Sequence, residues 1–204
     1  MSVLRKNITA TSTTACILAG GRSSRMGTDK GLLLFRGEPL VANIVRQLQS
    51  ATHEVIIVAN NPAYEIFGFR VIRDSIAEIG PAGGIYTALQ HASTEKIFVV
   101  GCDMPFITTE AVDYTIRQSN DSEITLPLFH DKVQPLFGVY SKSCLARWKR
   151  LIDSGETRLQ SMVERFTLKK IPVEGNSIFD DLIFTNLNNR TDFSNALKYS
   201  ENEN

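Results

Sequence analysis

Short apolar runs alternate with amphipathic segments through the first 118 residues of this 204-residue chain. Polar residues do not alternate with apolar ones within these runs, which is typical of strands that are buried on both faces. Apolar residues at helical spacing mark the segments between them. The expected strands are residues 15–19, 54–59, 69–72 and 97–100, and the expected helices contain residues 40–48, 85–92 and 112–116, the last capped by Thr108 or Thr109. This order predicts an α/β fold with a mostly parallel central sheet and helices on both faces.

The second half of the sequence is less regular. The expected strands are residues 124–126, 133–140 and 168–173, with a turn at 129–132, and the expected helices are residues 145–152, 157–166 and 192–199. No segment rich in Pro, Gly or Ser separates the two halves. We therefore expect a single domain over residues 15–199, preceded by a flexible N-terminal extension at residues 1–14.

Composition argues against several kinds of partner. The 22 basic and 22 acidic residues cancel, so the whole chain carries no net charge that would attract nucleic acid or an anionic membrane. No apolar run reaches the length of a membrane span, and residues 1–14 lack the apolar core of a secretory signal. Cys16, Cys102 and Cys144 lack metal-binding spacing and are expected to be buried thiols. These observations predict a cytoplasmic protein with no nucleic-acid or membrane partner.

A glycine-rich loop directly follows the first expected strand, with Gly20 and Gly21 at its start. Adjacent glycines let backbone amides approach a ligand closely, because no Cβ stands in the way. Arg22, Arg25 and Lys30 add positive charge further along the loop. Together these features predict a polyphosphate site at the carboxyl ends of the strands.

Two well-known phosphate loops do not match this sequence. A Walker A loop would need Gly-Lys-Ser/Thr five residues after another glycine, but Thr28 follows Gly27 and Arg22 stands five residues before it. The dinucleotide fingerprint also fails, because Ser23 stands where the spacing from Gly21 requires a second glycine. The loop must therefore be of another type.

Two aspartates follow expected strands and are candidates for the same edge of the sheet. Asp103 closes the strand at residues 97–100, and Mg²⁺ needs only one or two carboxylates when substrate phosphates and water complete its shell. The alternative for Asp103 is a turn residue that caps the next segment. Asp74 follows the strand at residues 69–72, and the alternative for it is an ordinary loop aspartate. Asp103 is thus the predicted metal ligand.

The string Leu-Ala-Gly-Gly-x-x-x-Arg-Met-Gly-x-Asp-Lys at residues 18–30 resembles the signature of molybdenum cofactor guanylyltransferases. Cys-Asp-Met-Pro at residues 102–105 is similar to a second motif of that family. Sugar-nucleotide and cytidylyl relatives usually lack the Asp of the Asp29–Lys30 pair. The resemblance covers nearly the whole chain. It implies a single-domain Rossmann-like nucleotidyltransferase fold, with a nucleotide-binding half at about residues 15–118 and an acceptor-binding half at about residues 119–199.

The resemblance also implies roles for individual residues. In the family, the backbone at the start of the loop holds the nucleotide, a lysine contacts its phosphates and an aspartate binds Mg²⁺ and GTP. The implied GTP-binding residues are Leu18, Ala19, Gly20, Gly21, Lys30, Asp74 and Asp103; the implied catalytic residues are Lys30, Arg25 and Asp103; and the implied metal ligand is Asp103.

Shorter motifs resemble family segments less specifically. Residues 80–84 are similar to the base-recognition segment, while Gln134-Pro135-Leu136, residues 155–158 and Asn186-Leu187-Asn188 resemble acceptor-site segments. A helix start, a strand-edge proline or an Asx turn would explain each of them equally well. Two positions depart from the family. Val58 stands where some members have an asparagine that touches GTP, which Asn60 or Asn61 could replace, and Asn189-Arg190 stands where Thr-Pro usually follows the last motif.

The implied reaction is transfer of GMP from GTP to molybdenum-bound molybdopterin, with Mg²⁺ as cofactor and diphosphate as the second product. The implied partners are these two substrates, other cofactor-biosynthesis proteins or recipient molybdoenzymes, and the chain is expected to be a monomer. Two alternatives stay open at this point. One is cytidylyl or other nucleotidyl transfer to a related pterin or a sugar phosphate, and the other is a non-catalytic nucleotide-binding module.

Overall fold

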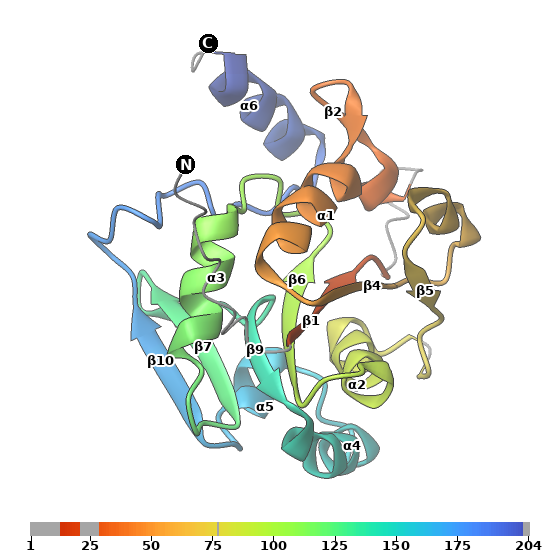
Figure 1. Cartoon of the computed structure of the whole chain (residues 1–204), viewed down its shortest axis with the longest axis vertical. Helices are drawn as coiled ribbons and strands as arrows, with labels where there is room; N and C mark the ends of the chain where they lie inside the picture. The colour runs from red at the N-terminus through yellow and green to blue at the C-terminus, as the bar shows by residue number, and fades with distance from the viewer. Residues whose placement is uncertain (1–12, 21–28, 77, 202–204) are drawn as a thin grey trace, which may run out of the picture.

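A computed structural model describes residues 13–20, 29–76 and 78–201. Its centre is a mixed sheet of eight strands within these ranges (Figure 1). The order across the sheet is β10 (Leu168–Pro172), β7 (Ile124–Phe129), β9 (Phe137–Ser141), β6 (Lys96–Gly101), β1 (Thr13–Leu18), β4 (Glu54–Val58) and β5 (Arg70–Ile72), with β8 (Lys132–Val133) beside β7. Only the pairings of β9 with β6 and β7, and of β8 with β7, are antiparallel. The predicted, mostly parallel sheet is confirmed.

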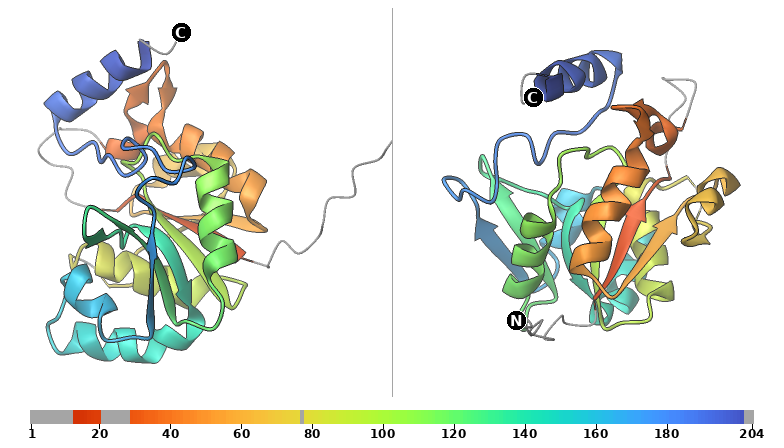
Figure 2. Two further views of the ribbon diagram at one scale, coloured as in Figure 1. Left: turned by 90° about the vertical axis from the view of Figure 1, so that its left-hand side faces the viewer. Right: turned by 45° about the horizontal axis from the view of Figure 1, so that its top comes forward.

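Helices cover both faces of the sheet, as predicted. On one face lie α1 (Leu40–Ala51) and α3 (Thr109–Gln118), and on the other lie α2 (Pro81–His91), α4 (Leu145–Asp153) and α5 (Leu159–Val163) (Figures 1 and 2). Successive residues of β1 point to opposite faces, so Ala15 and Ile17 join one core cluster while Cys16 and Leu18 join the other. All four are buried, which is the reason why this strand shows no polar alternation.

The structure moves some expected boundaries. β1 begins at Thr13 rather than Ala15, so the expected extension at residues 1–14 is too long at its end; residues 1–12 lie outside the described part of the chain. The error arose because Thr13 and Thr14 are polar, yet both are fully buried and the Thr14 amide donates to Thr94 Oγ1 at 2.9 Å. The helix expected at residues 157–166 is confined to α5.

The strand expected at residues 133–140 is two strands. β8 ends at Val133 and β9 begins at Phe137, with Pro135 between them. Proline has no amide to donate to a neighbouring strand, so the ladder is interrupted there. The expected turn before β8 is confirmed: His130 and Asp131 both have positive φ, 49° and 58°.

A hairpin of β2 (Leu34–Phe35) and β3 (Glu38–Pro39) was not predicted. It lies beside the last helix, α6 (Arg190–Glu201), at one end of the molecule (Figure 2). Phe35 packs edge-to-face against Phe106 and Phe193, with ring centroids 5.8 Å apart in both pairs. This small cluster fastens α6 to the hairpin. Strands of two residues carry too little pattern to be recognised in a sequence.

In the part of the chain that the structure describes, short 3₁₀ helices occupy three connections: η2 (Lys30–Leu32), η3 (Pro62–Phe67) and η4 (Lys142–Cys144). The three cysteines are buried, free thiols, as expected. Within the described ranges, no helix has both the length and the apolar character that crossing a membrane would require.

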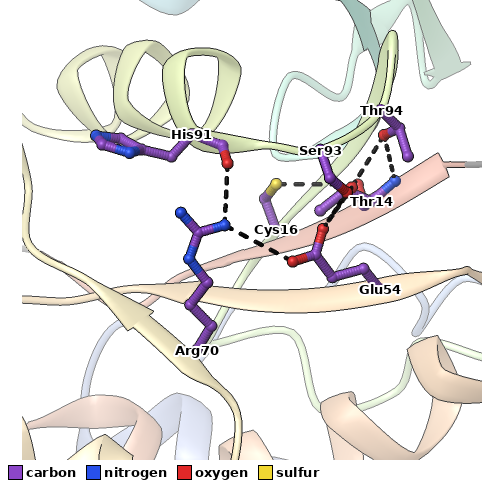
Figure 3. A network of polar contacts seen from close by, with 7 residues as sticks. All are labelled: Thr14, Cys16, Glu54, Arg70, His91, Ser93 and Thr94. Carbon is purple, nitrogen blue, oxygen red and sulfur yellow. Dashed lines mark hydrogen bonds and ion pairs between the residues drawn. The ribbon is translucent and has the colours of Figure 1, made fainter.

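Polar side chains close the amino-terminal edge of the sheet around Glu54, the first residue of β4 (Figure 3). The Glu54 carboxylate accepts hydrogen bonds from Thr14 Oγ1 at 3.1 Å and Ser93 Oγ at 2.5 Å. Arg70 lies 3.8 Å from the same carboxylate and donates to the His91 carbonyl at 3.1 Å. Burial alone would raise the pKa of Glu54, but the two hydroxyls and Arg70 together lower this pKa below its ordinary value. The network joins β1, β4, β5 and the end of α2.

Changing Glu54 to Gln is expected to lower the free energy of unfolding at pH 7 by about 1–2 kcal/mol, because hydrogen bonds to a charged acceptor are replaced by weaker ones. The folded-state pKa of Glu54 lies below its unfolded value, so its contribution is complete above the unfolded pKa and is lost as the pH falls through the folded pKa. Urea unfolding at pH 7 and below about pH 4 should therefore show the two proteins converging in acid.

The matched control is Asp113→Asn, which removes an exposed ion pair with Arg117 on α3 and should change stability little. A Glu54→Gln deficit that stays constant into acid would contradict the assignment.

Candidate nucleotide site

The carboxyl ends of β1 and β6 bring the start of the glycine loop next to Asp103. The two strands are parallel neighbours in which Leu18 pairs with Gly101. Past the strands, the Cys102 amide donates to the Leu18 carbonyl at 3.1 Å, and the Ala19 amide donates to the Val58 carbonyl at 2.9 Å. The glycine loop and Asp103 therefore leave the same edge of the sheet, as predicted.

Lys30 connects three distant parts of the chain at this edge. Its Nζ lies 3.1 Å from Asp103 Oδ2 and 3.0 Å from Asn188 Oδ1, although Asn188 is 158 residues away in the sequence. The Lys30 and Asp103 side chains are 19% and 17% exposed. They are thus largely shielded but still within reach of a ligand. The structure brings together the predicted Lys30, the predicted Asp103 and one asparagine of the weaker Asn-x-Asn motif.

A capping box at the start of α6 orients Asn188. Asn189 Oδ1 accepts from the amides of Thr191 and Asp192 at 2.8 and 2.9 Å, and Asp192 Oδ2 accepts from the amides of Asn188 and Asn189 at 2.9 and 3.2 Å. The Leu187 amide also donates to the Asp103 carbonyl at 2.9 Å. Asn189 thus caps the helix, a role that threonine can also perform, so the helix start is kept although the sequence departs from Thr-Pro.

Glycine at position 101 lets the Asp103 carboxylate lie against the end of β6. A Cβ at Gly101 would stand 2.8 Å from Asp103 Oδ1. The Gly101 amide donates to the Leu136 carbonyl at 3.2 Å, so the Gln134–Leu136 segment adjoins the same strand end. Asn43 of α1 holds the following turn through a 2.8 Å hydrogen bond to the Pro105 carbonyl. Sequence reasoning missed Asn43, because a lone asparagine on a helix gives no signal.

Asp74 holds the loop before α2. Its Oδ1 accepts from Thr87 Oγ1 at 2.9 Å and from the Ile76 amide at 3.3 Å. A Cβ at Gly83 would stand 3.2 Å from this oxygen, and a Cβ at Gly84 would stand 3.2 Å from the Leu18 side chain. The glycines therefore let the start of α2 approach β1 closely. A nucleotide contact by Asp74 stays a prediction.

The two asparagines after β4 have structural partners. Asn60 Oδ1 accepts from the Asp74 amide at 3.2 Å. Asn61 Oδ1 accepts from the Ala63 amide at 3.0 Å and so caps η3. The Val58 side chain, 1% exposed, belongs to the core. Asn60 and Asn61 therefore organise the loops after β4. Neither of them stands at position 58, where some family members have an asparagine.

One predicted acceptor segment is not brought to this cluster. Residues 155–158 line a hollow of about 870 Å³ together with Arg147 and Arg165. It lies at α4 and α5, at the opposite end of the sheet from β2 and α6 (Figure 1). Gly21, Arg22 and Arg25 fall outside the described residues.

Among the described residues, Asp103 does not belong to a metal site built from protein side chains alone. Within residues 13–20, 29–76 and 78–201, no three His, Cys, Asp or Glu side chains gather closely enough to hold a metal ion. Burial, reinforced by the nearby Asp103 carboxylate, raises the pKa of the Cys102 thiol above its ordinary range, so this residue stays protonated. A metal at Asp103 would therefore need oxygen ligands from a substrate and water.

A mostly parallel α/β sheet with a glycine-rich sequence after β1 and a lysine–aspartate pair at the strand ends is the arrangement that the sequence resemblance to nucleotidyltransferases implies. Residues 15–171 match the sequence model described as the MobA-like NTP transferase domain, and the chain belongs to this family.

Relatives over most of the chain carry more specific names. A "probable molybdenum cofactor guanylyltransferase" from Flavobacterium johnsoniae is 32% identical over 86% of this chain and 91% of its own length. A protein of the same name from Pelotomaculum thermopropionicum is 34% identical over 93% of this chain and 94% of its own. The crystal structure of molybdopterin-guanine dinucleotide biosynthesis protein A from Archaeoglobus fulgidus has the same fold, with a TM-score of 0.80 and 23% identity over 93% of this chain and 100% of that chain.

Changing Asp192 to Ala is expected to speed hydrogen exchange at the amides of Asn188 and Asn189, because both lose the carboxylate that accepts their hydrogen bonds. Exchange measured by mass spectrometry on peptides that cover residues 186–192 tests this. The control is Asn195→Ala at an exposed position of the same helix, which should leave these amides unchanged. Equal protection in Asp192→Ala and wild type would show that the capping box does not hold Asn188.

Proposed function

We propose that this protein transfers GMP from GTP to molybdenum-bound molybdopterin, forming the molybdopterin guanine dinucleotide cofactor and releasing diphosphate. The observation that carries the proposal is the meeting of Lys30, Asp103 and Asn188 where the glycine loop leaves the sheet. The names of relatives that align over most of the chain supply the base and the acceptor.

The reaction makes modest demands on protein side chains. The attacking group is a phosphate oxygen of the pterin, which is already an anion and needs no Ser, Cys or His to activate it. It displaces diphosphate from the α-phosphorus of GTP, so catalysis depends on positioning and on neutralising charge. Lys30 would stabilise the leaving diphosphate, with Arg25 as its expected helper. Asn188 and Asp103 hold the Lys30 ammonium in place before any ligand binds.

The donor chemistry at Asp103 fits Mg²⁺. The ion prefers one or two carboxylates and completes its octahedral shell with water and phosphate oxygens, and Asp103 is one partly exposed carboxylate beside the glycine loop. Mg²⁺ held by Asp103 would neutralise charge on the triphosphate. No second protein ligand is required for this role.

The remaining contacts follow from the strand ends. The Ala19 amide already bonds to Val58, so binding of GTP by this stretch would use the Ala19 carbonyl and the backbone of Gly20, with Gly21 beyond it. Asp74 lies against Gly83 at the start of α2, and Gly84 of the same helix lies against the Leu18 side chain at the end of β1. The acceptor would approach from residues 119–199, where the Gln134–Leu136 segment touches Gly101. We also propose that the protein works as a cytoplasmic monomer that exchanges substrate or product with other cofactor-biosynthesis proteins or recipient molybdoenzymes.

GTP with Mg²⁺ is expected to raise the melting temperature more than ATP, CTP or UTP with Mg²⁺. A ligand that binds only the folded state stabilises it according to its affinity, so a thermal-shift panel of the four nucleotides ranks them directly. A clear preference for CTP would contradict guanylyl transfer and would favour a cytidylyltransferase of the same family.

Changing Asp103 to Asn should abolish most transfer while metal-free GTP binding is largely kept. The two side chains are nearly equal in size, but Asn lacks the charge that a hard cation prefers. Mg²⁺-dependent diphosphate release and GTP titration without metal measure the two properties, with circular dichroism to check folding. Asp121→Asn, at an exposed position before β7, is the control. Unchanged activity with the same Mg²⁺ dependence would remove Asp103 from the metal site and make Asp74 the next candidate.

A further inference from the structure

Two consecutive residues at the end of the glycine loop are held from different directions. Lys30 reaches Asp103 and Asn188, as described above. The Asp29 side chain instead contacts η3, the short helix that follows β4. The peptide between the two residues is therefore anchored through both of its side chains.

The Asp29 carboxylate is held by two side chains of η3 and its cap. The Tyr64 hydroxyl donates to Oδ1, and Asn61 Nδ2 donates to Oδ2 at 3.4 Å. Asp29 itself stands at the N-cap position of η2, where an aspartate usually accepts a hydrogen bond from the helix backbone. No such bond forms here, because the carboxylate is turned toward Tyr64 and Asn61. Asp29 thus joins two loops instead of capping its own helix.

The position of Tyr64 is tightly determined. The side chain is fully buried, and burial together with the nearby Cys102 and Asp29 raises the pKa of its phenol above the ordinary value. The hydroxyl therefore stays protonated and remains a donor. The ring lies against the backbone of Gly31, where a Cβ would stand 3.1 Å from Cε1 and 3.2 Å from Cζ. Glycine after Lys30 is what allows Tyr64 to reach Asp29.

Asn61 is oriented by a second bond. Its Oδ1 accepts from the Ala63 amide at 3.0 Å at the start of η3, which leaves Nδ2 directed at Asp29. One side chain therefore fixes both the helix start and the carboxylate. Asn61 therefore has a structural role at its own position. It does not replace the asparagine that some family members have at position 58.

On the basis of the proposed function, we propose that Tyr64 and Asn61 are positioning residues for the nucleotide site. They hold the Asp29 carboxylate, which fixes the backbone of Asp29 and Lys30 and so sets the direction in which Lys30 extends toward the phosphates. Neither residue touches the substrate. Asp29, the residue that sugar-nucleotide and cytidylyl relatives usually lack, acts as an anchor and not as a ligand.

Tyr64→Phe is expected to weaken binding of the Mg²⁺–nucleotide complex about ten-fold, because the hydrogen bond it removes is made to a charged group. Binding is measured by equilibrium titration with whichever of the four nucleotides the wild type binds most tightly. The result therefore does not depend on GTP being the true substrate, or on transfer to the pterin. Tyr114→Phe, which removes a hydroxyl from a tyrosine packed on the same core cluster, should bind like wild type.

Two further experiments separate positioning from a merely structural role. In a Lys30→Ala background, Tyr64→Phe should change affinity no further, because its effect passes through Lys30. Asn61→Asp keeps the cap of η3 but places a second carboxylate against Asp29, so it should weaken binding. Adding Asp29→Asn exchanges the amide and the carboxylate and should restore it.

The proposal is overturned by any of three results. The first is wild-type affinity in Tyr64→Phe, even if its melting temperature falls. The second is an equal loss of affinity from Tyr64→Phe with and without Lys30. The third is an exchanged pair that binds no better than Asn61→Asp alone.

Discussion

The parallel pairing of β1 with β6 is the constraint on which the site depends. Leu18 and Gly101 are register partners, so the glycine loop and Asp103 emerge side by side. The two strands are buried on both faces by helices, and this burial fixes their register because a one-residue shift would exchange the side chains that pack in the two core clusters, Ala15 and Ile17 in one and Cys16 and Leu18 in the other. The strand ends therefore give the charged side chains that follow them, Lys30 and Asp103, well-defined positions.

The two charged side chains at the strand ends, Lys30 and Asp103, pair with each other in the structure without a ligand. Lys30 and Asp103 are both largely shielded, and shielded charges that lack partners are costly. The contact between Lys30 and Asp103, together with the hydrogen bond from Lys30 to Asn188, keeps an ammonium group and a carboxylate side by side at the strand ends. A triphosphate with a divalent cation carries the complementary pair of charges. In the function proposed here, each half of the ion pair would gain a new partner of the correct sign, so the residues that hold one another without ligand would also hold the nucleotide and its cation.

Much of the fold and part of the site could be predicted from sequence. Unbroken apolar runs such as residues 55–58 indicated strands covered on both faces, and the family-like strings contain Lys30 and Asp103, which the structure places in contact. Asn188 was harder to assign, because a three-residue motif has many possible meanings until α6 is placed. The contacts of Tyr64 and Asn61 with Asp29 could not be predicted, since they exist only when β4 lies beside β1. The antiparallel β9 was also beyond reach, because a buried strand has the same composition in either direction.

The most direct test of guanylyl transfer follows the label of GTP into products. The protein is incubated with Mg²⁺, molybdenum-bound molybdopterin and GTP labelled at either the α- or the γ-phosphorus, and the pterin and phosphate products are separated. For guanylyl transfer we expect α-label in the pterin dinucleotide and γ-label in diphosphate, with both nearly absent in Lys30→Ala. Release of γ-label as inorganic phosphate, or a pterin that carries no α-label, would contradict it.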